Sequence, residues 1–388
     1  MSTTEPSPAI PSPPAPSTTD PWQRTVTHVE QQARACAELG SPLYAALLHR
    51  VARDIRDGGP CAEVLAGYED APGPQAVALR LLGGVHALVL SGQAPDLAAH
   101  YPSTGGTVDP RHPDACWPAF RAAVAEHPSW LRDWLTRPPQ TNEVGRANLL
   151  LIGLLRVLAR QPLPVRLFEL GASAGLNLRA ERFRWVADGL DWGPDASPVE
   201  LAPAWRGTPP GWLSRAVAER PAPPTVVERA GCDLTPLDPL TPEGALALRA
   251  YVWPDQTPRL ARLEGALRVA AEVPATVHRQ GAAAFLAGLT LREGTLTVVW
   301  HSVMRQYVPA EEWAAVEREL DRLAAEATAD TGFAHVAFEP RRVGREHRFL
   351  LTVRHAGAPE EVVAEALPHG LPAWPAPAEA GQVVRRVG

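Results

Sequence analysis

The segment VRLFELGASAGLNL, residues 165–178, constrains the fold of this chain more than any other. An apolar run of strand length ends at Glu169-Leu170, a turn containing Gly171 and Gly175 follows, and Leu176 opens a helix. This order is typical of a parallel sheet covered by helices, whose ligands bind at the carboxyl ends of the strands. Glycines let the main chain approach a ligand, and the helix N-terminus offers free amides. The segment therefore predicts a site for a nucleotide-like ligand.

The chain before this segment is expected to be helical. Between residues 22 and 160, apolar side chains recur every three or four residues, as in SPLYAALLHRVARDI at 41–55. Further helices are expected around 117–126 and 143–159, and no strand is needed, which predicts an all-α domain over 22–160. Residues 1–21 contain seven prolines among Ser, Thr and Ala, a composition typical of a disordered tail.

After the prolines at 162 and 164, apolar runs of strand length alternate with segments rich in Ala, Arg and Glu. This alternation predicts an α/β domain over 161–388, built on a Rossmann-like, mainly parallel, doubly wound sheet. Two long helices are expected at Gly244–Ala271 and Ala310–Ala327, and the Pro-, Gly- and Trp-rich stretch 185–224 is expected to be an irregular insertion. The expected strands are 165–170, 225–234, 275–278, 295–302, 335–339 and 347–353.

Composition excludes several classes of function. All 37 basic residues are Arg, so the chain offers no Schiff-base or phosphate-binding lysine. A net charge of −6 gives no long-range attraction to nucleic acid or to an anionic membrane. The four cysteines are scattered, which predicts reduced structural thiols and neither a disulfide framework nor a metal site. The N-terminus resembles no signal peptide, and no apolar run is long enough to span a bilayer, so we expect a cytoplasmic protein.

The glycine turn resembles the acidic–glycine motif of class I methyltransferases, which bind S-adenosylmethionine. In this comparison Glu169 is the acid, and Ser173 stands at the middle glycine of the motif. The strand at 225–234 ends in Asp233, where the family has a carboxylate that accepts hydrogen bonds from the ribose hydroxyls. The resemblance implies a cofactor site formed by Glu169, Gly171, Ser173, Gly175, Asn177, Asp233, Gln280 and Ser302.

The strand at 295–302 is similar to the one that ends beneath the methyl group in that family. The resemblance implies catalytic roles for His301 and Tyr307, with His301 as a proton acceptor because imidazole exchanges protons near neutral pH. Arg305 lies in the following turn and suits an anionic acceptor. In the helical region, a polar segment before an apolar helix either caps that helix or faces the sheet and binds a small-molecule acceptor. Its residues are Asn142, Glu143 and Arg146.

Two other interpretations of the glycine turn remain open. The sequence of residues 171–175, GASAG, also satisfies the nucleophile-elbow pattern of serine hydrolases with Ser173 as nucleophile, and Asp238 and His301 follow in the required order. Alternatively, the turn serves only strand-to-helix packing in a catalytically inactive, methyltransferase-like binding or scaffold protein. A dinucleotide-binding fingerprint fails, because Leu176 stands where its third glycine is required.

Over nearly its whole length after the tail, the sequence resembles a bacterial family, common in actinobacteria, that is recorded as a domain of unknown function. The stretches that carry this resemblance are QTNEVGR, LFELGASAGLNLRAERFRW, VVERAGCDLTPLDPLTPEG, LRAYVWPDQ and VVWHSVMRQYVP. Where many relatives have Trp, this chain has Arg305. The resemblance implies no particular activity, so the expectation of S-adenosylmethionine binding depends on the order of the motifs.

Overall fold

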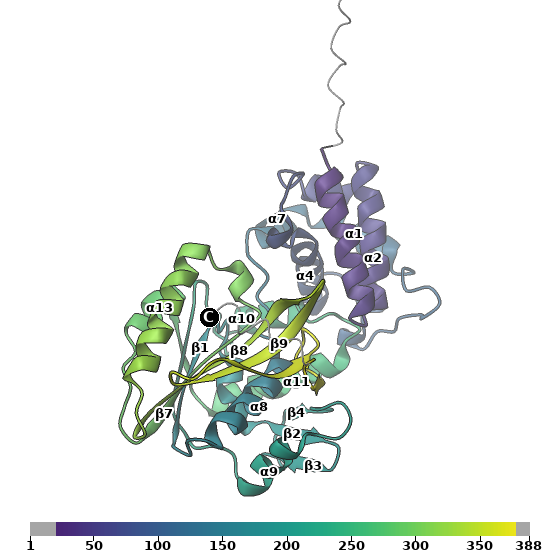
Figure 1. Ribbon diagram of the computed structural model, residues 1–388. Coiled ribbons are helices and arrows are strands. Elements are labelled where there is room, and N and C mark those ends of the chain that lie inside the picture. The colour runs from purple at the N-terminus through teal and green to yellow at the C-terminus, as the bar shows by residue number, and fades with distance from the viewer. Residues whose placement is uncertain (1–20, 378–388) are drawn as a thin grey trace, which may run out of the picture.

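The computed structural model describes residues 21–377, so the tail predicted for 1–21 lies outside the described residues except for Pro21. The following residues up to 160 are helical, as predicted, and α1 and α2 lie side by side (Figure 1). Helix α2 begins after Ser41, whose hydroxyl accepts a hydrogen bond from the Tyr44 amide. The helices are α1 (Gln23–Glu38), α2 (Pro42–Arg56), α3 (Pro60–Val64), α4 (Val77–Leu90), α5 (Pro95–Ala98), α6 (Trp117–Glu126), α7 (Pro128–Leu135) and α8 (Ala147–Leu158).

A large sheet follows, with the strand order β11-β10-β9-β8-β7-β1-β5-β6. The strands from β8 to β6 are mutually parallel, whereas β9, β10 and β11 extend the sheet in antiparallel pairs. The chain places β5 and β6 on one side of β1, and β7 and β8 on the other. The strands are β1 (Val165–Leu170), β5 (Val226–Asp233), β6 (Thr276–Arg279), β7 (Thr295–Ser302), β8 (Thr331–Val343), β9 (Glu346–His355), β10 (Glu361–Ala366) and β11 (Ala373–Trp374).

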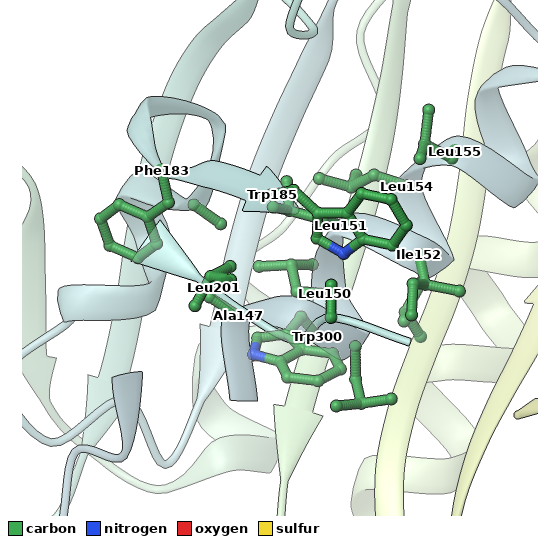
Figure 2. Close-up of a cluster of buried hydrophobic side chains, with 14 of the residues drawn as sticks. Ala147, Leu150, Leu151, Ile152, Leu154, Leu155, Phe183, Trp185, Leu201 and Trp300 are labelled. Atoms are coloured by element: carbon green, nitrogen blue, oxygen red, sulfur yellow. The ribbon is translucent and has the colours of Figure 1, made fainter. Parts of the chain in front are cut away.

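Helices cover both faces of the parallel strands. All six residues of β1 are buried, and alternate residues face opposite sides of the sheet. Leu167 packs in the core that includes α8 and α11 (Thr257–Glu272), whereas Phe168 packs in the core with α12 (Ala282–Ala287) and α13 (Ala310–Glu326). Figure 2 shows the first of these cores, in which Trp185 and Trp300 lie among the leucines of α8.

The prediction of one long helix over 244–271 was wrong. This region forms α10 (Pro242–Ala250) and α11, separated by a turn that contains Pro254, which has no amide hydrogen to continue a helix. Trp253 in this turn packs into the core of the N-terminal helices. Asp255 accepts hydrogen bonds from the Ser41 hydroxyl at 2.7 Å and the Leu43 amide at 3.1 Å. The interruption therefore ties the helical region to the sheet.

The prediction of an irregular insertion at 185–224 was also wrong. Strands β2 (Arg184–Ala187), β3 (Leu190–Trp192) and β4 (Glu200–Leu201) form a small sheet, and α9 (Gly211–Glu219) follows. Trp185 is fully buried and donates from Nε1 to the Asn148 side-chain oxygen at 2.6 Å. The tryptophans of this stretch thus help to fill a core.

Three smaller observations complete the fold. The helix predicted from 143 begins at Ala147, because a short 3-10 turn (Val144–Arg146) comes first. The four cysteines are buried and free, as expected. Within residues 21–377, no helix combines the length and the apolar character that crossing a bilayer requires.

Candidate functional site

The carboxyl ends of the parallel strands meet at one edge of the sheet. The register places Leu170, at the end of β1, beside Cys232 of β5 and beside His301 of β7. Because parallel strands all end at the same edge, residues from distant parts of the sequence are neighbours here. The residues predicted for the cofactor site from the ends of β1, β5, β6 and β7 therefore share this edge.

The turn after β1 adopts the left-handed conformation at Gly171, Ser173 and Gly175, with φ angles of +65°, +54° and +66°. Ser173 lacks the freedom of glycine, so this conformation costs about 1 kcal/mol or more and needs support. Asp233 supplies that support, since its Oδ2 accepts a hydrogen bond from the Ser173 amide at 2.9 Å. Its Oδ1 accepts another from the Thr235 amide at 2.9 Å. The glycine turn and Asp233 are in direct contact.

A segment of the helical region lies against this turn. We call residues 138–142, which lead from α7 toward α8, the strap. The side chain of Gln140 accepts a hydrogen bond from the Ser173 hydroxyl and donates one to the Thr235 hydroxyl, both at 2.7 Å. The Asn142 side-chain oxygen accepts from the Leu176 amide at 2.8 Å. The sequence indicated Asn142 as a candidate but missed Gln140, because nothing in the pattern shows that two remote segments meet.

Glu169 is a deeply buried acid at this edge, with 2% of its surface exposed. Its Oε1 accepts a hydrogen bond from the Trp300 indole at 3.1 Å, and its Oε2 has no partner among the described residues. Burial raises the pKa of Glu169 to about 8, although the hydrogen bond from Trp300, the neighbouring Asn177 side chain and the charge of Arg146 act in the opposite direction. Glu169 is therefore mostly protonated at neutral pH in this structure.

Glu143 and Arg146 differ in their partners. Glu143 accepts from Arg259 at 2.7 Å and 2.5 Å, and both side chains are less than a tenth exposed. Burial alone would raise the pKa of Glu143, but Arg259, His369, Arg262 and the Gly145 amide together outweigh burial and lower that pKa to about 2. Arg146 donates to the carbonyl oxygens of Pro368 and Ser302 at 3.1 Å and 3.4 Å. No carboxylate within residues 21–377 lies within ion-pair distance of the Arg146 guanidinium.

His301 forms a buried pair with Glu339, which ends the apolar part of β8. Its Nδ1 lies 2.8 Å from Glu339 Oε1, and each side chain is 2% exposed. The same oxygen accepts from the amides of Met304 and Arg305 at 3.0 Å and 3.3 Å. Glu339 thus holds the turn after β7, in which Val303 has a φ of +51°. Sequence analysis missed Glu339, although an acid that follows an apolar strand was the signal used for Glu169.

The other predicted residues lie around these groups. The His301 ring packs against Trp313 of α13, so it faces the side of the sheet that α12 and α13 cover. Tyr307 is 63% exposed. The Arg305 guanidinium lies over the Trp313 ring, 5.1 Å from its centroid. The Gln280 amide donates to the Asp233 carbonyl at 3.1 Å, which places Gln280 at the ends of β5 and β6.

The geometry does not assemble the alternative hydrolase site. The Ser173 hydroxyl donates to Gln140, whereas His301 is bound to Glu339. Asp238 accepts from the Leu240 amide at 2.9 Å, within its own turn. A serine nucleophile requires a base within hydrogen-bond reach, and the described residues place neither His301 nor Asp238 in the required relay.

Comparison with known proteins identifies a family. The model of a family described as an uncharacterized protein conserved in bacteria, DUF2332, matches residues 26–374. No curated protein and no solved structure matches the chain. The family description states no activity, so the function has to be argued from the site.

Proposed function

The chain belongs to the DUF2332 family of uncharacterised bacterial proteins, and we propose that its carboxyl edge binds S-adenosylmethionine and transfers the methyl group to a small-molecule acceptor. The observation that carries the proposal is the contact between the Asp233 carboxylate and the glycine turn. A carboxylate and a turn that exposes main-chain amides are the two groups that bind an adenosine at a parallel sheet.

The strand order supports the position of this site. In the parallel order β8-β7-β1-β5-β6, the chain adds β5 and β6 on one side of β1 and then β7 and β8 on the other, as expected for a Rossmann-like sheet. Ligands of such sheets bind where the strand order reverses, at the carboxyl ends. The glycine turn follows β1, which is the strand at that point.

The individual groups suit the parts of the cofactor. Each Asp233 oxygen accepts one main-chain hydrogen bond and keeps a lone pair for a ribose hydroxyl. Leu234, the next residue, is 71% exposed and offers an apolar surface to the adenine, with Gln280 beside it. Glu169 Oε2 has no partner among the described residues, and it suits the cofactor's ammonium group once Glu169 has released its proton. The Arg146 guanidinium, which has no acidic partner within residues 21–377, suits the carboxylate of the cofactor.

Methyl transfer requires mainly positioning by the protein. The acceptor attacks the methyl carbon in line with the sulfonium, which leaves as a neutral thioether, so little further covalent chemistry is needed. His301 suits a positioning role more than that of proton acceptor, because its free Nε2 is shielded from solvent. Together with Glu339 it fixes the turn at 302–305, beside which the acceptor would bind.

The strap supports a second candidate, a methyltransferase-like protein that does not turn over. Gln140 and Asn142 already use the Ser173 hydroxyl and the Leu176 amide. A cofactor therefore binds either with these side chains in place or after the strap moves. If neither occurs, the strap blocks the cofactor site and the protein is a scaffold without catalytic activity.

Isothermal titration calorimetry with S-adenosylhomocysteine separates these candidates. Wild-type protein is expected to bind, and Asp233→Asn is expected to bind at least about tenfold more weakly, since a charged hydrogen bond contributes more than about 1.4 kcal/mol. Asp238→Asn is the matched control, because Asp238 also accepts an amide within its own turn but lies outside the proposed site. No binding to wild type, or equal losses in both variants, would contradict the proposal.

A further inference from the structure

A cleft of about 400 Å³ opens beside the ends of β7 and β8, under the first turns of α13. Its volume is in the range of sites for small molecules. The residues that line it and matter here are Arg305, Gln306, Trp313, Ala314, Glu317 and Glu339. The turn that borders it also touches the proposed cofactor site, because a methyl group on Gly171 would lie 3.0 Å from Met304 Cβ.

The charges that line the cleft favour a positively charged ligand. Glu339 is 2% exposed, and its Oε2 has no hydrogen-bond partner among the described residues. A buried carboxylate oxygen without a donor is costly, and a ligand that carries N–H groups removes that cost. Glu317 adds a second, exposed carboxylate at the mouth. Arg305 is the only base among the lining residues.

The position of Arg305 shows how a cation fits. Its guanidinium lies 5.1 Å from the centre of the Trp313 ring and 3.9 Å from a Glu317 oxygen. A cation over an aromatic ring with a carboxylate beside it is the usual arrangement for recognition of organic cations. The Arg305 side chain is 43% exposed, so it can leave the Trp313 ring without breaking a buried contact.

We infer that this cleft binds a small organic cation, an alkyl- or arylalkylammonium, that takes the place of the Arg305 guanidinium. Its ammonium group binds toward Glu339 and Glu317, and its apolar part packs on Trp313 and Ala314. Deep binding requires the turn at 303–307 to shift, because Glu339 Oε2 is shielded from solvent.

The cation bound in the cleft is then the methyl acceptor. This step rests on the proposed function. The ammonium first loses a proton to solvent. The lone pair of the amine forms an N–C bond to the methyl carbon as the C–S bond breaks, and the sulfonium becomes a neutral thioether. The product is a methylammonium ion, so charge and atoms balance.

Calorimetry with benzylammonium as the probe, without any cofactor, tests the cleft. Wild-type protein is expected to bind benzylammonium at least about tenfold more tightly than benzyl alcohol, which has the same ring and no charge. Ala314→Phe, at an exposed position of α13 that lines the cleft, is expected to weaken binding at least about tenfold by filling it. Ala325→Phe, at an exposed position farther along α13, is the control.

Glu339→Gln tests the charge without changing the shape, and it is expected to reduce the preference for benzylammonium over benzyl alcohol. If this variant fails to fold, Ala314→Phe still decides the question. Equal affinity for the two probes, no binding, or equal effects of the two phenylalanine variants would overturn the inference. Binding of benzylammonium without binding of S-adenosylhomocysteine would contradict the proposed function alone, and the reverse result would contradict the cleft alone.

Discussion

Glu169→Gln tests whether the carboxyl edge holds a protonated acid. Burial raises the pKa of Glu169 from 4.5 to about 8 in the folded protein. Between these values the folded protein holds a proton that the unfolded chain has released, so the stability falls as the pH rises through this window. At about 1.4 kcal/mol for each pH unit, this group lowers the free energy of unfolding by up to about 5 kcal/mol at pH 8, relative to acidic solution.

A glutamine at position 169 is neutral at every pH and removes this dependence. The free energy of unfolding of the variant, relative to that of the wild type, is expected to rise by several kcal/mol between about pH 5 and pH 8.5. Urea denaturation followed by circular dichroism at several pH values measures it, and groups common to both proteins cancel in the difference. Glu126→Gln, at an exposed position of α6, is the control. A difference that stays constant within about 1 kcal/mol over this range would refute the reasoning.

Two further substitutions test the groups around the site. Glu143→Gln leaves Arg259 buried without its carboxylate and is expected to lower the free energy of unfolding by about 3–5 kcal/mol in urea denaturation; a loss below about 1 kcal/mol would show that the pair is solvated. Gly175→Ala, at a φ of +66° with Val277 2.8 Å from the new methyl group, is expected to cost about 1–3 kcal/mol. Gly189→Ala is the control for the clash, because Gly189 has a φ of +70° and nothing lies within 4 Å of its added methyl group. If Gly175→Ala and Gly189→Ala lower the melting temperature equally, only the backbone angle matters.

The core of the site could be predicted from the sequence because its signals are local. Glu169, the glycine turn and Asp233 each follow an apolar strand, and parallel pairing brings such strand ends together whatever the rest of the chain does. The same rule would have identified Glu339 at the end of the apolar part of β8. An acid that ends an apolar strand is informative because a buried strand offers it no other reason to be there.

The rest depends on contacts between distant segments, which leave no period in the sequence. The apolar spacing of 244–271 continues through Trp253. Pro254 interrupts the helix, whereas the docking of Trp253 into the helical core is a contact between distant segments. Gln140 lies in the strap and forms side-chain hydrogen bonds with Ser173 and Thr235 of the sheet region. Neither contact follows from propensity, because tertiary packing decides both.

The buried ionisable groups at the carboxyl edge are themselves an argument for a ligand. Glu169, Arg146 and Glu339 are buried or partly buried. Glu169 and Glu339 each keep one oxygen without a partner among the described residues, and Arg146 donates to two main-chain carbonyls but has no acidic partner within those residues. Folding alone does not favour this arrangement, because apolar residues of similar size would serve the core at least as well. Ionisable groups that a fold holds at such a cost concentrate at sites where a substrate or cofactor completes their partners. The edge that carries these three groups is the edge at which the glycine turn meets Asp233, so the two lines of evidence converge on one place.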